Sequence, residues 1–158
     1  MLRPFFDWFQ ELAFAIAFRA STWMFPVVDA VHLLALVVFA GAILLVDLRL
    51  LGVMKDRPAT QVSRDATPWL LGSIAVLFVS GTLMIMGNGD KYYYSDYFWQ
   101  KIAVLAVGMV YTFTIRRKVI ALSDDGRMRP FLRRASGMFS ICLWSFVAVW
   151  GRLIGLLS

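Results

Sequence analysis

Histidine and cysteine are nearly absent from this chain of 158 residues, which contains one of each. The single cysteine, Cys142, excludes an internal disulfide and any zinc or iron–sulfur site built from several cysteines. The single histidine, His32, leaves little room for hydrolytic triad chemistry, and the sequence contains no P-loop or zinc-binding motif. These absences exclude the enzyme classes that short motifs reveal most readily.

Charged residues are also few, because they make up 16% of the chain while hydrophobic residues make up 60%. The mean hydropathy of +0.71 is too high for a soluble domain of this size or for a disordered chain. The net charge of +6 comes from basic residues beside apolar runs, where they indicate membrane topology rather than nucleic-acid binding. We therefore expect a single integral membrane domain over residues 1–158, with the lipid bilayer as a partner and no nucleic acid.

Four long apolar runs predict four membrane-spanning helices. The clearest one extends from Val27 to Gly52 and has no charged side chain between Leu33 and Val46. About 20 helical residues are enough to span the hydrocarbon core of a bilayer. The predicted spans are about 26–51, 69–87, 97–115 and 135–157. The fold class expected is all-α, an antiparallel bundle of four transmembrane helices.

The distribution of lysine and arginine predicts the orientation of the spans. Four basic residues lie between the first and second spans: Arg49, Lys55, Arg57 and Arg64. Seven lie between the third and fourth spans: Arg116, Arg117, Lys118, Arg127, Arg129, Arg133 and Arg134. The opposite side carries three: Arg3, Arg19 and Lys91. Under the positive-inside rule both basic connections are cytoplasmic, and both termini lie on the outer side.

The segments outside the spans carry their own patterns. Residues 3–20 predict one amphipathic helix in the membrane surface, with a polar stripe on one face, and this helix would cover the outer end of the bundle as a lid. Residues 55–67 are expected to form a polar linker, and Arg116 is expected to begin the polar segment that ends the third span. Asp47 and Arg49 are expected to pair at the inner membrane surface.

Four ionisable groups lie within spans at one depth, the outer third of the membrane: Asp29, His32, Lys101 and Arg152. Met84 and Met86 share this depth. Charged groups inside a membrane are costly, and they are tolerated where they face a partner, a cavity or a ligand. Each group also has a structural interpretation: a hydrogen bond to a carbonyl for the histidine, ion pairing for the aspartate, snorkelling for the two cations and packing for the methionines.

Taken together, these groups predict a cofactor site. Neutral imidazole is a common axial ligand of haem iron, so His32 is the expected metal ligand, and Lys101 and Arg152 suit the two haem propionates. Asp29 would orient the imidazole, and the iron would be five-coordinate or take Met84 or Met86 as its sixth ligand. A quinone bound through histidine and lysine is one alternative, and Cu(I) bound by a histidine–methionine set is another.

A family resemblance points to the same fold. Its residues are His32, the run Asp47–Gly52 (DLRLLG), the run Phe98–Lys101 (FWQK) and Gly151-Arg152. They resemble an uncharacterised bacterial family of small four-span inner-membrane proteins, which implies an inner-membrane location with periplasmic termini. More distantly, a first-span histidine with a third-span lysine resembles the HemJ-type protoporphyrinogen oxidases and the copper-resistance D-type membrane proteins. That resemblance implies that His32 and Lys101 lie beside a tetrapyrrole or copper.

The sequence therefore predicts an integral membrane cofactor-binding protein. Haem b is the first choice of cofactor, quinone-linked electron transfer is the implied activity, and it stays open whether the chain is an enzyme, such as a redox subunit. One alternative is a non-catalytic accessory or scaffold subunit of a larger membrane complex or homo-oligomer. The other is copper handling. Other membrane subunits or further copies of the chain are the expected protein partners.

Overall fold

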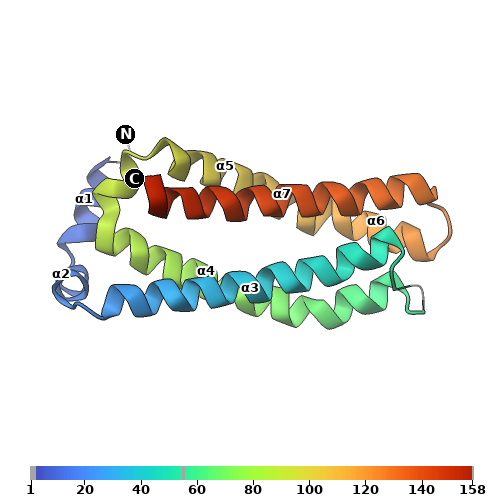
Figure 1. The fold of residues 1–158 in the computed structure, drawn as a ribbon, viewed down its shortest axis with the longest axis horizontal. Coiled ribbons are helices and arrows are strands. Elements are labelled where there is room, and N and C mark those ends of the chain that lie inside the picture. Colours follow the sequence, from blue (N-terminus) through green and yellow to red (C-terminus); the bar gives the residue numbers. More distant parts are fainter. Residues whose placement is uncertain (1–2, 55, 158) are drawn as a thin grey trace.

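The computed structural model describes residues 3–54 and 56–157, without the side chains of residues 3, 5, 6, 9, 14, 90, 91 and 152–157. All regular elements within these ranges are helices (Figure 1). In chain order they are α1 (Arg3–Glu11), α2 (Ala13–Ala20), α3 (Met24–Leu51), α4 (Ala59–Tyr93), α5 (Asp96–Val110), η1 (Tyr111–Ile115), α6 (Arg116–Asp124) and α7 (Pro130–Leu157). The prediction of an all-α chain is confirmed for this part of the protein.

Four long helical segments run lengthwise through the molecule: α3, α4, the continuous helix α5–η1–α6, and α7 (Figure 1). Both chain termini lie at one end, here called the terminal end, together with α1 and α2. The connections at 52–58 and 125–129 lie at the other end, here called the loop end. α3 packs mainly on α4 and α7, and α5 packs mainly on α7.

Three of the four long segments are apolar and long enough to cross a membrane. They are Met24–Leu51, Ala59–Gly89 and Asp96–Asp124. Many of their large apolar side chains point away from the bundle, as Val37 (69% exposed) and Phe78 (77% exposed) do. Such outward apolar surface suits acyl chains as solvent rather than water. The chain is therefore a membrane protein with at least three apolar helices of spanning length.

The core lies in the loop-end half and the middle of the bundle. α3 contributes residues at a helical spacing of three or four, and α4, α6 and α7 pack against them. The buried set is Phe39, Ala42, Ile43, Val46, Leu50, Ala59, Val62, Ala66, Leu70, Val119, Ile120, Trp144 and Val147. Trp144 lies at its centre, with its ring edge-to-face against Phe39 at 4.5 Å and in close contact with Gly108. A glycine at position 108 lets the indole approach the α5 backbone.

A buried ion pair joins α3 to α6. Arg116 donates from Nε (3.0 Å) and Nη2 (2.8 Å) to Asp47 Oδ1, and from Nη2 to the carbonyl oxygen of Ile43 (2.7 Å). The side chain of Asp47 is 0% exposed and that of Arg116 is 4% exposed. This pairing corrects the expected Asp47–Arg49 pair, since residues two apart lie on different faces of a helix. Arg49 instead donates to the carbonyl of Arg57.

The same contact explains why Arg116 does not end the third long helix, as the sequence had suggested. The chain passes from α5 through the π-helical turn η1 into α6 and ends at Asp124. π-helical turns shift the register of a helix. Here Tyr111 at the start of η1 donates to the carbonyl of Ser136 (2.9 Å), so the turn is also tied to α7.

α4 begins earlier than the polar composition of residues 55–67 suggested, so the expected linker is wrong for residues 59–67. The backbone amides of Ala59 and Thr60 donate to the two carboxylate oxygens of Asp124 (2.8 and 2.7 Å). A carboxylate at a helix N-terminus satisfies free amides and interacts favourably with the helix dipole. Pro68 lies inside the helix, where its cost is offset by the buried face of α4. At its other end α4 kinks at Asn88.

The N-terminal segment forms two helices rather than the single helix expected for residues 3–20. The break is at Leu12, whose φ and ψ angles of −59° and 135° are extended. Arg19 closes the corner by donating to the carbonyl oxygen (2.7 Å) and to Oε1 (3.0 Å) of Gln10. Gln10 contacts α4 at Gly89, where any β-carbon would collide with it. The break therefore lets both short helices pack on the terminal end of the bundle.

We expect the Asp47–Arg116 pair to control stability through desolvation. Asp47→Ala strands a buried guanidinium and should lower the free energy of unfolding by about 3–5 kcal/mol. Replacing both partners with apolar residues, Asp47→Leu with Arg116→Met, should recover most of that loss. Unfolding in detergent, followed by tryptophan fluorescence, measures both values. Lys118→Met, at an exposed position two residues along, is the control. If the losses of the single variants Asp47→Leu and Arg116→Met simply added up in the double variant, this account would be contradicted.

Candidate cofactor site

His32 on α3 and Ser80 on α4 face each other in the half of the bundle nearer the terminal end. The imidazole Nδ1 lies 2.8 Å from Ser80 Oγ, and the pair is partly buried. Gly81 follows directly, and a β-carbon there would lie 3.6 Å from His32 Cε1. The ring is therefore held by a hydrogen bond from one side and by a glycine backbone beside it.

The hydrogen bond determines which nitrogen of His32 carries the proton. The Ser80 hydroxyl points its hydrogen at the carbonyl oxygen of Val76 (2.6 Å). A hydroxyl has one hydrogen, so we infer that Ser80 Oγ accepts from the histidine and that Nδ1 is protonated. In a neutral imidazole of this tautomer Nε2 carries a free lone pair. In metal sites, too, the tautomer of a histidine is set by the hydrogen bond of its other ring nitrogen.

Lys101 on α5 lies on the other side of this region. Its side chain is half-buried, and a β-carbon at Gly151 of α7 would lie 3.1 Å from Nζ. The next residue toward the N-terminus, Gln100, accepts a hydrogen bond from Trp150 Nε1 (2.6 Å), which ties α5 to α7 at the same level. The ammonium is near enough to His32 to interact with it electrostatically. The structure therefore brings together groups from α3, α4 and α5.

The remaining predicted site residues are tied to His32 less directly than Ser80 is. Asp29 lies one turn before His32 and interacts with it electrostatically, but the hydrogen bond that orients the ring comes from Ser80. Met84 and Met86 are half-buried on α4, beyond Ser80 toward the terminal end. Arg152 belongs to helix α7, and its side chain lies outside the described residues. Asp29 and Lys101 thus act on His32 through their charges, whereas Ser80 is hydrogen-bonded to it.

Ser80 is the site residue that sequence reasoning missed. It is 4% exposed, in the middle of an apolar helix, and it is followed by a glycine. A hydroxyl at such depth needs a partner, and serine in membrane helices commonly finds it on another helix. The Ser80-Gly81 pair inside an uncharged run could therefore have indicated a contact with another helix at this position.

The donor set limits what metal could bind without a further cofactor. Among the side chains that the structure describes, no three histidine, cysteine, aspartate or glutamate residues are grouped to hold a metal ion. Cys142 is exposed on α7. A single imidazole with a free Nε2 fits an iron whose other ligands come from a porphyrin better than it fits a metal held by protein atoms alone.

The fold and this region together define a helical membrane protein with a histidine held between two apolar helices. The chain belongs to a family of unknown function, DUF6644, whose sequence model matches residues 5–157. No curated protein and no solved structure matches the chain. The family model covers nearly the whole chain, but its description names no ligand. A function can therefore be proposed only from the chemistry of the site.

The tautomer of His32 can be measured directly because the chain has one histidine. In protein labelled with ¹⁵N-histidine, we expect the nitrogen spectrum to show a protonated Nδ1 and an unprotonated Nε2. Ser80→Ala removes the acceptor and should shift the spectrum toward the other tautomer. Thr82→Val, two residues along α4, should leave the spectrum unchanged. A protonated Nε2 in the unsubstituted protein would disprove the assignment.

Proposed function

We propose that this protein is a haem b carrier of the membrane, with His32 as the axial ligand of the iron and quinone-linked electron transfer as its activity. The observation that supports this most strongly is the chain of two hydrogen bonds from His32 Nδ1 to Ser80 and from Ser80 to Val76. It leaves Nε2 available on the one imidazole of the chain. Bound haem would supply one-electron chemistry, and the chain supplies its ligand and surroundings.

Haem suits this geometry better than the alternatives. Hydrogen bonding to a quinone carbonyl needs a donor, and Nε2 of this tautomer has no proton to donate. Copper bound by protein atoms alone needs several donors grouped together, and the described histidine, cysteine, aspartate and glutamate side chains form no such group. A haem needs one strong axial donor from the chain and a cation for each propionate. His32 fits the first requirement.

Lys101 is the proposed partner of one propionate. It comes from α5, whereas the imidazole and its hydrogen-bond partner come from α3 and α4, and its charge acts on His32. Its Nζ lies against the small Gly151, and a bulkier residue there would displace the ammonium. Arg152 is proposed for the second propionate and Met86 for the sixth iron position, both from their places in the sequence.

We also propose that α7 is a fourth span and that both termini are periplasmic in a bacterial inner membrane. All four long segments have an uncharged stretch of at least 14 residues: residues 33–46, 66–89, 102–115 and 135–151. The basic connections lie at the loop end, which favours a cytoplasmic location for that end. The two N-terminal helices would then lie at the periplasmic surface.

Absorption spectroscopy tests the haem proposal. The protein purified from haem-supplied cells should show a Soret band and bind about one haem per chain. His32→Ala should abolish the band, while Val31→Ala, which changes the exposed neighbour at the same depth, should leave it intact. Lys101→Met should keep the band and weaken haem retention. A band that survives His32→Ala would contradict the assignment, and a colourless protein that copurifies with another subunit would favour a scaffold role.

Cysteine labelling tests the orientation. In a Cys142→Ser background, Thr22→Cys lies between α2 and α3 at the terminal end, and Asp125→Cys lies at the loop end. We expect a membrane-impermeant maleimide to label Thr22→Cys in intact cells with permeable outer membranes. It should label Asp125→Cys only after the inner membrane is opened, because the basic end faces the cytoplasm. The reverse pattern would show the opposite orientation.

A further inference from the structure

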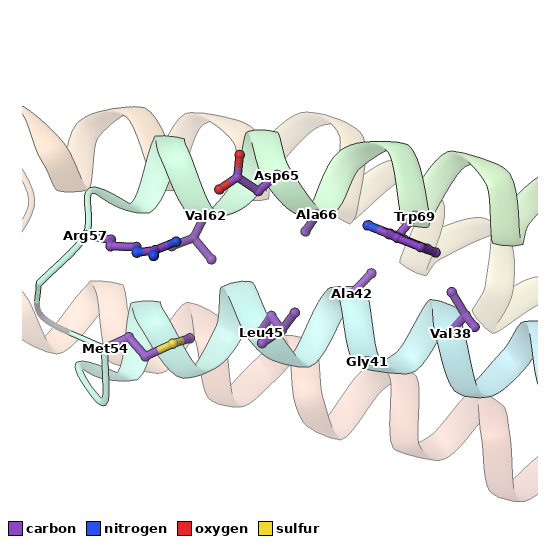
Figure 2. A pocket seen from close by; sticks show the side chains of 10 residues that line it. All are labelled: Val38, Gly41, Ala42, Leu45, Met54, Arg57, Val62, Asp65, Ala66 and Trp69. Atoms are coloured by element: carbon purple, nitrogen blue, oxygen red, sulfur yellow. The ribbon is translucent and has the colours of Figure 1, made fainter.

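A groove runs between α3 and α4 on the outside of the bundle, in the loop-end half (Figure 2). Its volume is about 490 Å³, within the range of small-molecule sites. The lining residues are Val38, Gly41, Ala42, Leu45, Met54, Arg57, Val62, Asp65, Ala66 and Trp69. Eight of the ten are uncharged, and the other two, Arg57 and Asp65, have opposite charges. Three of these residues, Ala42, Val62 and Ala66, also belong to the buried core, and none belongs to the His32 region.

Small residues keep the groove open. Gly41 and Ala42 on α3 lie opposite Ala66 on α4, and a β-carbon added at Gly41 would meet nothing within 4 Å. Figure 2 shows the Trp69 side chain and the Arg57 side chain between the two helices, toward opposite ends of the groove. The groove is therefore lined by apolar side chains over most of its length, and the guanidinium of Arg57 lies toward one end.

The position of the groove matches one leaflet of a bilayer. The charged residues that border the uncharged stretches at the loop end are Asp47, Asp65, Arg116 and Arg134, and the contact between Asp47 and Arg116 places these two at one level. Because hydrocarbon excludes unpaired charge, this level marks the edge of the apolar core. The groove crosses that edge, with Val38, Gly41 and Ala42 on the hydrocarbon side and Arg57 on the headgroup side (Figure 2).

The two charges of the groove are available to a ligand. Neither the Arg57 guanidinium nor the Asp65 carboxylate makes an ion pair or a side-chain hydrogen bond within the part of the chain that the structure describes. Arginine is well suited to phosphate, and a carboxylate accepts hydrogen bonds from an ammonium. A ligand with a phosphate, an ammonium and an apolar tail would satisfy both charges and fill the apolar part.

We propose that this groove binds one phospholipid with a primary amine in its headgroup, such as phosphatidylethanolamine. Arg57 contacts the phosphate, Asp65 accepts hydrogen bonds from the ammonium, and one acyl chain lies along Gly41, Ala42 and Leu45. An anionic headgroup fits less well because it would place a negative charge beside Asp65. A choline headgroup has the same net charge but no N–H group to donate.

Native mass spectrometry of the full chain in detergent tests the proposal. The probes are dioleoyl-phosphatidylethanolamine and dioleoyl-phosphatidylcholine, which have the same acyl chains. We expect one tightly retained ethanolamine lipid per chain and weaker binding of the choline lipid. Gly41→Leu fills the groove and should lower the affinity about tenfold or more. Gly72→Leu makes the same change where a β-carbon also meets nothing within 4 Å, but outside the groove, and should keep the lipid.

Two further variants separate the headgroup contacts. Arg57→Gln should weaken both lipids about tenfold, while Asp65→Asn should reduce only the preference for the ethanolamine lipid. Both positions are exposed, so neither variant disturbs the core. Equal retention by Gly41→Leu and Gly72→Leu would overturn the proposal. So would equal affinity for the two lipids, or a bound mass equal to a polypeptide. The groove and His32 lie at different levels, so this result is independent of haem binding.

Discussion

A carboxylate and a guanidinium meet inside the apolar bundle, and the register of three helices depends on that contact. Asp47 comes from α3, Arg116 comes from α6, and the Ile43 carbonyl accepts a further hydrogen bond from the same guanidinium. α7 closes over the pair, because Gly137 allows close approach to the Asp47 carbonyl. A buried ion pair recovers little net energy after desolvation, so we interpret it as a device that selects one alignment of the helices.

The alignment at the loop end has consequences at the terminal end. α3 and α7 are in close contact near Gly137 and at Trp144, and Figure 1 shows them diverging toward the chain termini. His32 on α3 and Lys101 on α5 lie in the half where the helices diverge. The tightly packed region therefore lies apart from the half of the bundle that contains His32 and Lys101. The groove between α3 and α4 has a different origin, because its lining near Gly41, Ala42 and Ala66 consists of small side chains.

Part of this arrangement was predictable from local sequence. Uncharged runs indicated the membrane helices, and helical rise placed His32 and Lys101 at one depth. Three expectations were wrong for a shared reason. Each depends on a contact between side chains or backbone groups that composition does not reveal. Asp47 pairs with Arg116 and the first amides of α4 bind Asp124, both more than 60 residues away, while the break at Leu12 is closed by Arg19 and Gln10, nine residues apart. Polar composition alone made residues 59–67 resemble a linker, although their buried face is apolar.

The sequence by itself determined the class of the protein, because hydropathy and helical period are local properties that a bilayer selects directly. It also determined which residues are costly to bury. Only the tertiary structure decided which partners they meet, because a partner depends on how each helix is rotated about its axis and shifted along it. The imidazole of His32 illustrates the difference: its depth follows from residue counting, but its hydrogen bond to Ser80 requires α3 and α4 in one particular register.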